Sequence, residues 1–170
     1  MNRFIPVDEL KWGEEMEYMI YILAESENGK KRLYLSNRGP ELIDKFNTSE
    51  FAKDTGIVLM PEFGGWMIEA VPSEPYMSLV DPKILLSCEE KLLFRRKTLE
   101  EYFKGFNIVP VSMTNVMHLG TEKAFYMEDE ELREYINHNM GHLEPINNFT
   151  QSKFAIDKTI NPHPRFGYLA

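Results

Sequence analysis

Residues 10–23 constrain the fold more than any other segment, because aromatic and branched side chains dominate them and favour a β-strand over a helix. Asn28 and Gly29 follow a few residues later, and this pair tolerates the positive backbone φ of a tight hairpin turn. Residues 31–36 then supply a second stretch that suits a strand. The sequence therefore predicts an antiparallel β-hairpin at the start of the fold.

Further strands and short helices are expected along the chain. A loop at 37–40 precedes a short helix over 41–46, and residues 64–70 predict another strand. Within that strand, Gly64 and Gly65 indicate a bulge or a place where something approaches the backbone closely.

A long helix is the clearest single element. Asp81 and Pro82 suit its N-cap and first position, and Gly105 suits a left-handed residue at its end. This helix should pack on the sheet, because it carries an apolar stripe made of Leu85, Cys88, Leu92, Leu99 and Phe103. With a strand over 107–113 and a short helix over 129–137, the expected fold class is α+β, an antiparallel β-sheet with packed helices.

Charge and composition exclude several classes of protein. The chain has 19 Lys and Arg against 27 Asp and Glu, a formal net charge of −8, which argues against binding to nucleic acid. The lone Cys88 excludes an internal disulfide and any zinc site with several thiolates, and it indicates a reduced, cytoplasmic protein. Since no apolar run approaches the ~18 to 20 residues that cross a membrane, no membrane association is expected.

The first candidate site residues are Glu15 and Glu17, in the acidic run of the first predicted strand. Side chains two residues apart share one face of a strand, so these carboxylates would project together and repel each other unless a cation or a proton lies between them. Carboxylate oxygens are suitable ligands for Mg²⁺. For this pair alone, the solvent-facing side of an edge strand is the simpler interpretation.

Two further candidates, Glu62 and Glu69, lie at opposite ends of the second hydrophobic segment. Seven residues separate them, so a regular strand would place them on opposite faces, and they converge only if Gly64 and Gly65 introduce a bulge or a bend. The alternative is that Glu69 is a buried acid with satisfied partners and Glu62 is a loop residue.

Other polar motifs carry less information. The basic run at 95–97 could meet a carboxylate or a phosphate, but on a helix such a run more often forms a solvated face. His138 and His142 are four residues apart, as in some zinc sites, but Gly141 between them favours histidines in a loop. The residues alone therefore lead to an acidic, oxygen-ligand metal site on an antiparallel sheet.

Four blocks of this sequence, in the same order, resemble the eukaryotic-type glutamate-cysteine ligase catalytic subunit, also called γ-glutamylcysteine synthetase. They are K-W-G-E-E-M-E-Y-M at 11–19, P-E-F-G-G-W-M-I-E-A-V-P-S-E-P-Y at 61–76, R-R-K at 95–97 and F-A-I-D-K-T-I-N-P-H-P-R-F at 154–166. The last block has one residue more than the family pattern after its first Phe. The resemblance covers most of this chain.

The resemblance implies a ligase that uses ATP and Mg²⁺ to activate the γ-carboxylate of glutamate as an acyl phosphate, which the amine of cysteine then attacks. It also implies a glutamine-synthetase-like fold of the carboxylate-amine ligases. The family's metal-binding acids carry over onto Glu15, Glu17, Glu62 and Glu69. Glutamate, cysteine and ATP would be the small-molecule partners in the complete enzyme.

Because family members are much longer, residues 1–170 are expected to be the N-terminal part of a single, incomplete ligase catalytic domain. Two alternatives belong to other classes of protein. The chain could be a non-catalytic remnant or split-enzyme half that binds a modifier subunit or a complementary C-terminal half, or an unrelated Mg²⁺-dependent hydrolase.

Overall fold

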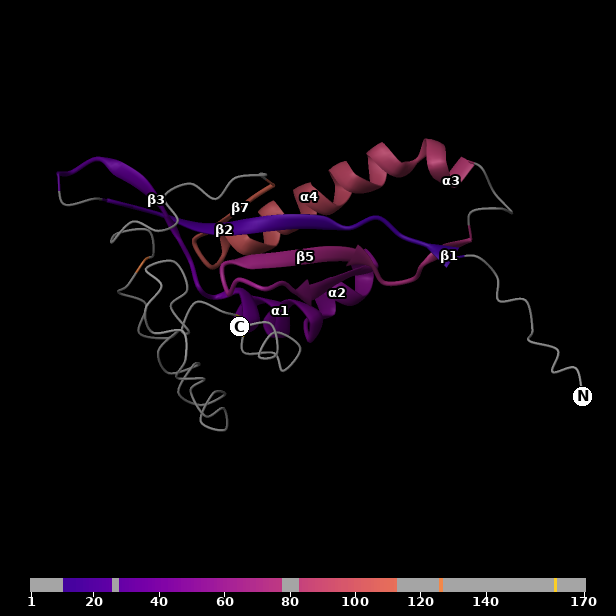
Figure 1. Cartoon of the computed structure of the whole chain (residues 1–170), viewed down its shortest axis with the longest axis horizontal. Coiled ribbons are helices and arrows are strands. Elements are labelled where there is room, and N and C mark those ends of the chain that lie inside the picture. Colours follow the sequence, from indigo (N-terminus) through magenta and orange to yellow (C-terminus); the bar gives the residue numbers. More distant parts are fainter. Residues whose placement is uncertain (1–10, 26–27, 78–82, 113–125, 127–160, 162–170) are drawn as a thin grey trace, which may run out of the picture.

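The computed structural model describes residues 11–25, 28–77, 83–112, 126 and 161, and all structural statements below concern these residues. They form a five-stranded sheet, a separate pair of short strands, and helices (Figure 1). The elements are β1 (Lys11–Trp12), β2 (Met16–Glu25), β3 (Lys31–Leu35), α1 (Gly39–Asn47), α2 (Glu50–Thr55), β4 (Ile57–Pro61), β5 (Met67–Pro72), β6 (Tyr76–Met77), α3 (Lys83–Leu86), α4 (Cys88–Lys104) and β7 (Ile108–Val111).

Strand β2 organises the sheet. It pairs antiparallel with β3, β5 and β7, and β4 extends the sheet by pairing antiparallel with β5. The two short strands β1 and β6 pair separately, also antiparallel. The predicted α+β class with an antiparallel sheet and packed helices is therefore confirmed. The predicted helix over 129–137 lies outside the described residues.

The predicted hairpin between β2 and β3 is also confirmed. Gly29 has a φ of 74°, which glycine adopts without steric cost. The Asn28 side-chain oxygen accepts a hydrogen bond from Lys30 N at 3.3 Å, so the turn residues do what their types indicate.

Over the described residues, the single strand predicted at 10–23 is two strands, β1 and β2, with an irregular segment between them. Strand β2 begins at Met16, opposite Ala70 in β5, and residues 13–15 lie outside any strand before pairing resumes between β1 and β6. Strand β5 ends at Pro72, which has no N–H to donate, so its ladder with β2 cannot simply continue. Glu15 and its acidic neighbour Glu14 therefore lie in a break between two stretches of antiparallel pairing.

The long helix predicted up to residue 105 is two helices, α3 and α4, separated at Ser87, whose hydroxyl donates to Ile84 O at 2.9 Å. The predicted left-handed residue at Gly105 is wrong, because its φ is −64°. The chain instead adopts a positive φ two residues later, at Asn107 (56°), just before β7. Asn is among the residues that tolerate this conformation.

Helix α1 begins at Gly39, two residues before the predicted start, because Pro40 is well suited to the first helical turn. Gly39 N donates to Gly65 O at 2.8 Å, and a Cβ on Gly39 would collide with that carbonyl. The close backbone approach predicted at Gly64 and Gly65 therefore exists, and the approaching group is the start of α1.

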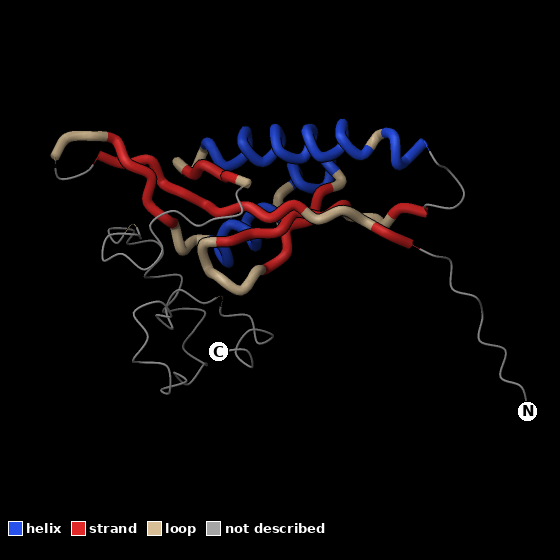
Figure 2. Tube along the Cα trace, turned by 45° about the horizontal axis from the view of Figure 1, so that its top comes forward, coloured by secondary structure: helices blue, strands red, loops and turns tan. Residues whose placement is uncertain are grey.

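Helices α1, α2 and α4 pack on one face of the sheet, and Figure 2 shows α4 lying over the strands. Of the predicted apolar stripe, Leu99 and Phe103 are fully buried, whereas Leu85, in the short helix α3 that precedes α4, is 57% exposed. The core combines alternate strand residues with helix residues: Tyr18, Ile20, Ile22, Leu42, Phe46, Ala52, Ile57, Leu59, Ile68, Ala70, Leu99, Phe103 and Ile108.

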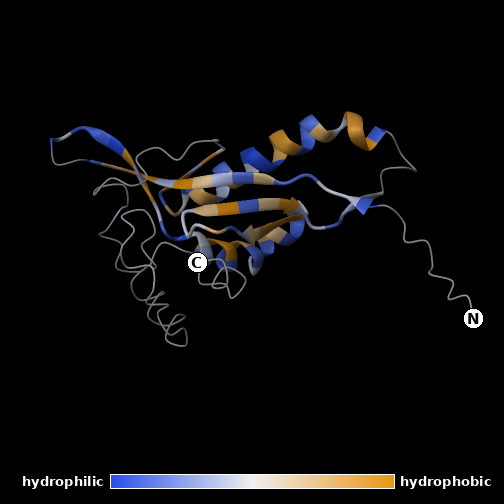
Figure 3. Cartoon of the chain, viewed as in Figure 1, coloured by the Kyte–Doolittle hydropathy of each residue, from blue (hydrophilic) through white to orange (hydrophobic). Residues whose placement is uncertain are grey.

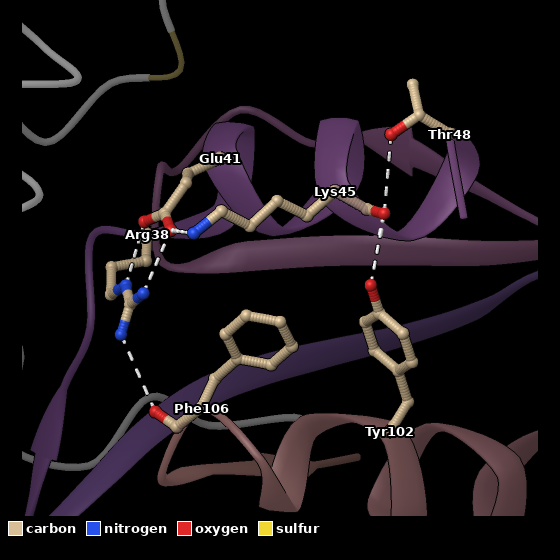
Figure 4. Close-up of polar contacts among 6 residues, drawn as sticks. All are labelled: Arg38, Glu41, Lys45, Thr48, Tyr102 and Phe106. Atoms are coloured by element: carbon tan, nitrogen blue, oxygen red, sulfur yellow. Dashed lines mark hydrogen bonds and ion pairs between the residues drawn. The ribbon is translucent and has the colours of Figure 1, made fainter. Parts of the chain in front are cut away.

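A buried ion-pair group ties α1 to the chain that follows α4 (Figure 4). Arg38 donates from Nε and Nη2 to the Glu41 carboxylate at 2.8 Å each, and Lys45 Nζ approaches the same carboxylate at 2.6 Å. Arg38 Nη1 also donates to Phe106 O at 3.5 Å, and the Tyr102 hydroxyl donates to Lys45 O at 3.0 Å. These contacts join the helix layer on the covered face of the sheet.

Candidate metal centre

Strand pairing brings two of the predicted acids together. Glu17 in β2 lies directly opposite Glu69 in β5. Both project from the face opposite the core, where Met19, Tyr21, Leu35 and Trp66 form a second, smaller apolar cluster. In Figure 3, β2 and β5 are largely hydrophobic strands with hydrophilic interruptions.

Glu62 reaches the same place by a route that differs from the prediction. The segment at 61–70 is not one strand with a bulge, because β4 ends at Pro61, β5 begins at Met67, and Gly64 and Gly65 lie in the reversal between them. Met67 N donates to Gly64 O at 2.9 Å within this turn. A change of chain direction therefore brings Glu62 to Glu69.

The acids meet around Glu69, whose exposed fraction is 8%. Its pKa is raised from its ordinary value of 4.5 to about 7, first by burial, then by the charge of Glu15, by a hydrogen bond and the charge of Glu62, and by the charge of Glu17. The structure thus brings all four predicted acids into one electrostatic cluster, and a proton or a cation would relieve their mutual repulsion.

Within the described residues, no three His, Cys, Asp or Glu side chains are arranged closely enough to hold a metal ion as they stand. The four acids therefore influence one another without forming a closed ligand shell. Their donor chemistry fits a hard cation, because Mg²⁺ uses a few carboxylates and keeps water molecules for its other positions. Glu15 and Glu17 are exposed, so their side chains are free to turn toward a cation at Glu69.

The two simpler interpretations are borne out in part. Glu17 is exposed, as a solvent-facing residue would be, and its only ladder partner among the described residues is Glu69, because the pairing of β2 with β7 begins at Met19 and that with β3 at Tyr21. Glu69 is buried and Glu62 lies in a loop, as the other interpretation requires, but the groups whose charges raise the pKa of Glu69 are themselves acids, so the described residues give it no cationic partner.

Arg95 meets a carboxylate, the less usual of the two roles considered for the basic run at 95–97. It was expected on a solvated face, and its neighbour Arg96 is indeed exposed and pairs with Glu100 at 2.9 Å. The Arg95 side chain is only 3% exposed, and its Nη2 lies 2.7 Å from Glu14 Oε1. A signal was present, because Arg95 precedes Leu99 by four residues and therefore continues the buried stripe of α4.

Two aromatic residues complete the surroundings of Glu14. The Tyr76 hydroxyl donates to Glu14 Oε1 at 2.9 Å, and burial followed by this contact with Glu14 raises the pKa of Tyr76 to about 12. Trp12 packs edge-on against Tyr76, with ring centroids 5.0 Å apart. Tyr76 therefore stays protonated and keeps Glu14 turned toward Arg95.

The last motif block contributes one described residue. Asn161 is 3% exposed, and its backbone N donates to Phe63 O at 2.9 Å, directly beside Glu62. The other residues of the block at 154–166 lie outside the described residues, as do His138 and His142.

Comparison with known proteins identifies the family of this chain. The family profile described as glutamate-cysteine ligase matches residues 3–170. A glutamate-cysteine ligase of Dictyostelium discoideum is 32% identical over 99% of this chain and 23% of its own length. The catalytic subunit of Rattus norvegicus is 30% identical, and the enzyme of Saccharomyces cerevisiae 24%, each over 95% of this chain and 23% of its own length.

The match along nearly the whole chain places this α+β protein in a ligase family. The chain belongs to the glutamate-cysteine ligase family. It spans about a quarter of the length of the curated relatives it matches. None of the helices in the described part of the chain has both the length and the apolar character needed to cross a bilayer.

Proposed function

We propose that this chain carries the Mg²⁺-binding acids of a glutamate-cysteine ligase, which joins the γ-carboxylate of L-glutamate to L-cysteine at the expense of ATP in the first step of glutathione biosynthesis. The observation that carries the proposal is the gathering of Glu15, Glu17 and Glu62 around the buried Glu69. Membership of the family supports the reaction, because the matched relatives are named for it.

The four acids would hold Mg²⁺, which supplies positive charge against the phosphoryl group during transfer from ATP to the γ-carboxylate. The chain's own contribution is to mount Glu17 and Glu69 on two paired strands, so that the ladder sets their separation, while Glu15 and Glu62 lie just beyond strand ends. Glu69 holds a proton up to about pH 7 and would release it when a cation enters, since ligands must be deprotonated.

We further propose that residues 1–170 are the N-terminal part of one catalytic domain with a glutamine-synthetase-like fold. The chain's share of its relatives' length, 23%, supports this. Sites for glutamate, cysteine and ATP would then be completed by polypeptide outside these residues, and the enzyme would be cytoplasmic. We expect the isolated chain to bind Mg²⁺ weakly and to lack ligase activity.

The same share of length supports a second candidate, a non-catalytic remnant or split-enzyme half that binds a complementary ligase chain or a modifier subunit. Co-purification with a complementary polypeptide that restores γ-glutamylcysteine formation would favour the split enzyme. Association that restores no activity would favour the remnant.

The metal assignment is tested by titrating the chain with Mn²⁺, as a paramagnetic substitute for Mg²⁺, and following free Mn²⁺ by electron paramagnetic resonance. Glu69→Gln should weaken binding at least tenfold. Glu89→Gln, an exposed acid on α4, should leave the affinity unchanged and serves as the matched control. Equal affinities in all three proteins would refute the assignment.

The reaction is tested in a complete ligase that contains these residues. Glu15→Gln combined with Glu69→Gln should abolish ATP-dependent formation of γ-glutamylcysteine, and unchanged turnover would refute the role of these acids. Ligase activity of the 170-residue chain alone would refute the incomplete domain. Hydrolysis of a phosphate ester without glutamate would favour the hydrolase instead.

A further inference from the structure

Arg95 contacts the two strand segments that carry the acid cluster. Its Nη1 donates to Glu14 O at 3.4 Å and to Ala70 O at 3.3 Å, and its Nη2 pairs with the Glu14 carboxylate at 2.7 Å. Glu14 immediately precedes Glu15, and Ala70 immediately follows Glu69. One guanidinium group therefore holds the neighbours of two candidate ligands that are far apart in the sequence.

These contacts occur where the β-ladder does not hold the chain. The last β2–β5 pair joins Met16 to Ala70, and residues 13–15 lie in the break beyond it. Without the regular ladder, the backbone at Glu15 depends on other groups for its position. The guanidinium is rigid, planar and rich in donors, so it can join two carbonyl oxygens and a carboxylate across the break.

Arg95 reaches this break from the helix-covered face. It projects from α4 and is buried, while Ala70 belongs to the core on that face. Glu69 projects to the opposite face, because side chains alternate along β5. Arg95 therefore forms no hydrogen bond or ion pair with the four acids among the described residues, and its contacts reach them through the backbone on which they are mounted.

Stability by itself is a weak explanation for this arrangement. Moving two charges out of water has a large desolvation cost, and a buried ion pair is often no more stabilising than apolar residues of the same size. Moreover, Arg95 Nε and Glu14 Oε2 are buried without a hydrogen-bond partner in the described part of the chain. What the pair does supply is a fixed geometry at Glu14 and Ala70.

We propose that Arg95 is a positioning residue for the cation site: from the far side of the sheet it fixes the backbone at Glu14 and Ala70, and so sets the spacing of Glu15 and Glu69. The inference rests on the proposed cation-binding function of these acids. Arg95 touches neither the cation nor a substrate in this proposal.

The test compares Mn²⁺ affinities of the full 170-residue chain by electron paramagnetic resonance. Arg95→Lys keeps the positive charge but loses the planar set of donors, so it should weaken Mn²⁺ binding at least tenfold. Arg96→Lys is the matched control, because Arg96 is the adjacent exposed residue, and its affinity should change less than twofold. Far-UV circular dichroism and the melting temperature of each variant verify that it is folded.

A double-mutant cycle separates positioning from general damage. Glu14→Gln should weaken Mn²⁺ binding about threefold, and adding it to Arg95→Lys should cause no further loss, because both changes act through one contact. Amide hydrogen exchange adds a readout without metal: Arg95→Lys should speed exchange at residues 13–17 and 68–72, but not in β3. If Arg95→Lys does not fold, Glu14→Gln decides the question by the same two measurements.

The possible outcomes separate this inference from the proposed function. If the unsubstituted chain binds Mn²⁺ and folded Arg95→Lys binds it equally well, the inference is wrong and the metal site stands. If the unsubstituted chain binds no Mn²⁺, the metal site fails and the inference fails with it. A loss confined to Arg95→Lys and Glu14→Gln, without additivity, supports the inference.

Discussion

Two buried glutamates on opposite faces of the sheet show what the surroundings of a carboxylate decide. Glu41 and Glu69 are 3% and 8% exposed, so both have lost most of their contact with water. Burial would raise the pKa of Glu41, but hydrogen bonds to Arg38 and Lys45 outweigh it and hold the pKa below its usual value. For Glu69 the neighbouring charges act with burial, and the pKa rises to about 7.

The opposite pKa shifts of Glu41 and Glu69 distinguish a structural face of the sheet from a candidate functional face. On the helix-covered face, buried acids have cationic partners, as expected for groups that join structural elements. On the other face, acids are placed beside acids, which costs stability unless something else binds there. Strongly shifted acids of this kind are enriched at functional sites. The four predictions below test this division, in order of decreasing expected effect.

The largest effect is expected for Arg38→Ala. This change leaves the buried Glu41 carboxylate with Lys45 alone, and loss of one partner from a buried pair typically costs about 3 kcal/mol or more. Urea unfolding at pH 8 measures the change in the free energy of unfolding. Lys53→Ala is the control, because it breaks an exposed pair with Glu50 and should cost less than about 0.5 kcal/mol. Equal losses would remove the distinction between buried and exposed pairs.

The second effect is a pH dependence with a defined sign. Folded Glu69 keeps its proton up to about pH 7, whereas the unfolded chain loses it near 4.5, so stability falls as the pH rises between these values. Glu69→Gln should remove this fall, worth about 1 to 3 kcal/mol. Glu41 acts in the opposite sense, because its lowered pKa gives stability that is lost on acidification. A pH profile unchanged by Glu69→Gln would contradict the cluster.

The third effect is stabilisation by a cation. Mn²⁺ at ten times its dissociation constant should raise the free energy of unfolding by about 1.4 kcal/mol, because it binds only the folded state. The increase should be larger at pH 8 than at pH 6, since a proton competes for Glu69. Thermal unfolding with and without Mn²⁺ measures it. An increase that survives in Glu69→Gln would place the cation elsewhere.

The smallest expected effect is a difference between Glu15 and Glu17 in how strongly each raises the pKa of Glu69. Glu15→Gln should lower the pKa of Glu69 more than Glu17→Gln does, because the charge of Glu15 acts on it more strongly. Nuclear magnetic resonance titration of the Glu69 side-chain carboxyl carbon measures both shifts. The reverse order would mean that Glu17, directly opposite Glu69 in the ladder, is the dominant neighbour.

Local signals in the sequence predict the fold better than contacts between distant segments do. The composition of residues 10–23 and the turn at Asn28 and Gly29 predict the β2–β3 hairpin, because both depend on neighbours in the chain. The break at residues 13–15 could not be predicted in this way. It coincides with the end of the partner strand at Pro72, and strand pairing between distant segments is not visible in one sequence.

The acid cluster, too, depends on contacts between distant segments that one sequence does not reveal. Alternation predicts that Glu15 and Glu17 point together, but bringing Glu62 to Glu69 requires the reversal between β4 and β5 and the Glu17–Glu69 register. Arg95 was predictable from its position in the buried stripe of α4. Its partner Glu14 was not, because 81 residues separate them in the sequence.

The backbone at Gly39 contacts the backbone at Gly65, in the turn that carries Glu62. Even a single methyl group at position 39 would push the turn outward, since the carbonyl it would strike belongs to the turn's own backbone. Position 39 therefore controls how far Glu62 reaches, although it lies outside the acid cluster. A side chain at position 39 would weaken the proposed cation site even where all four acids are intact.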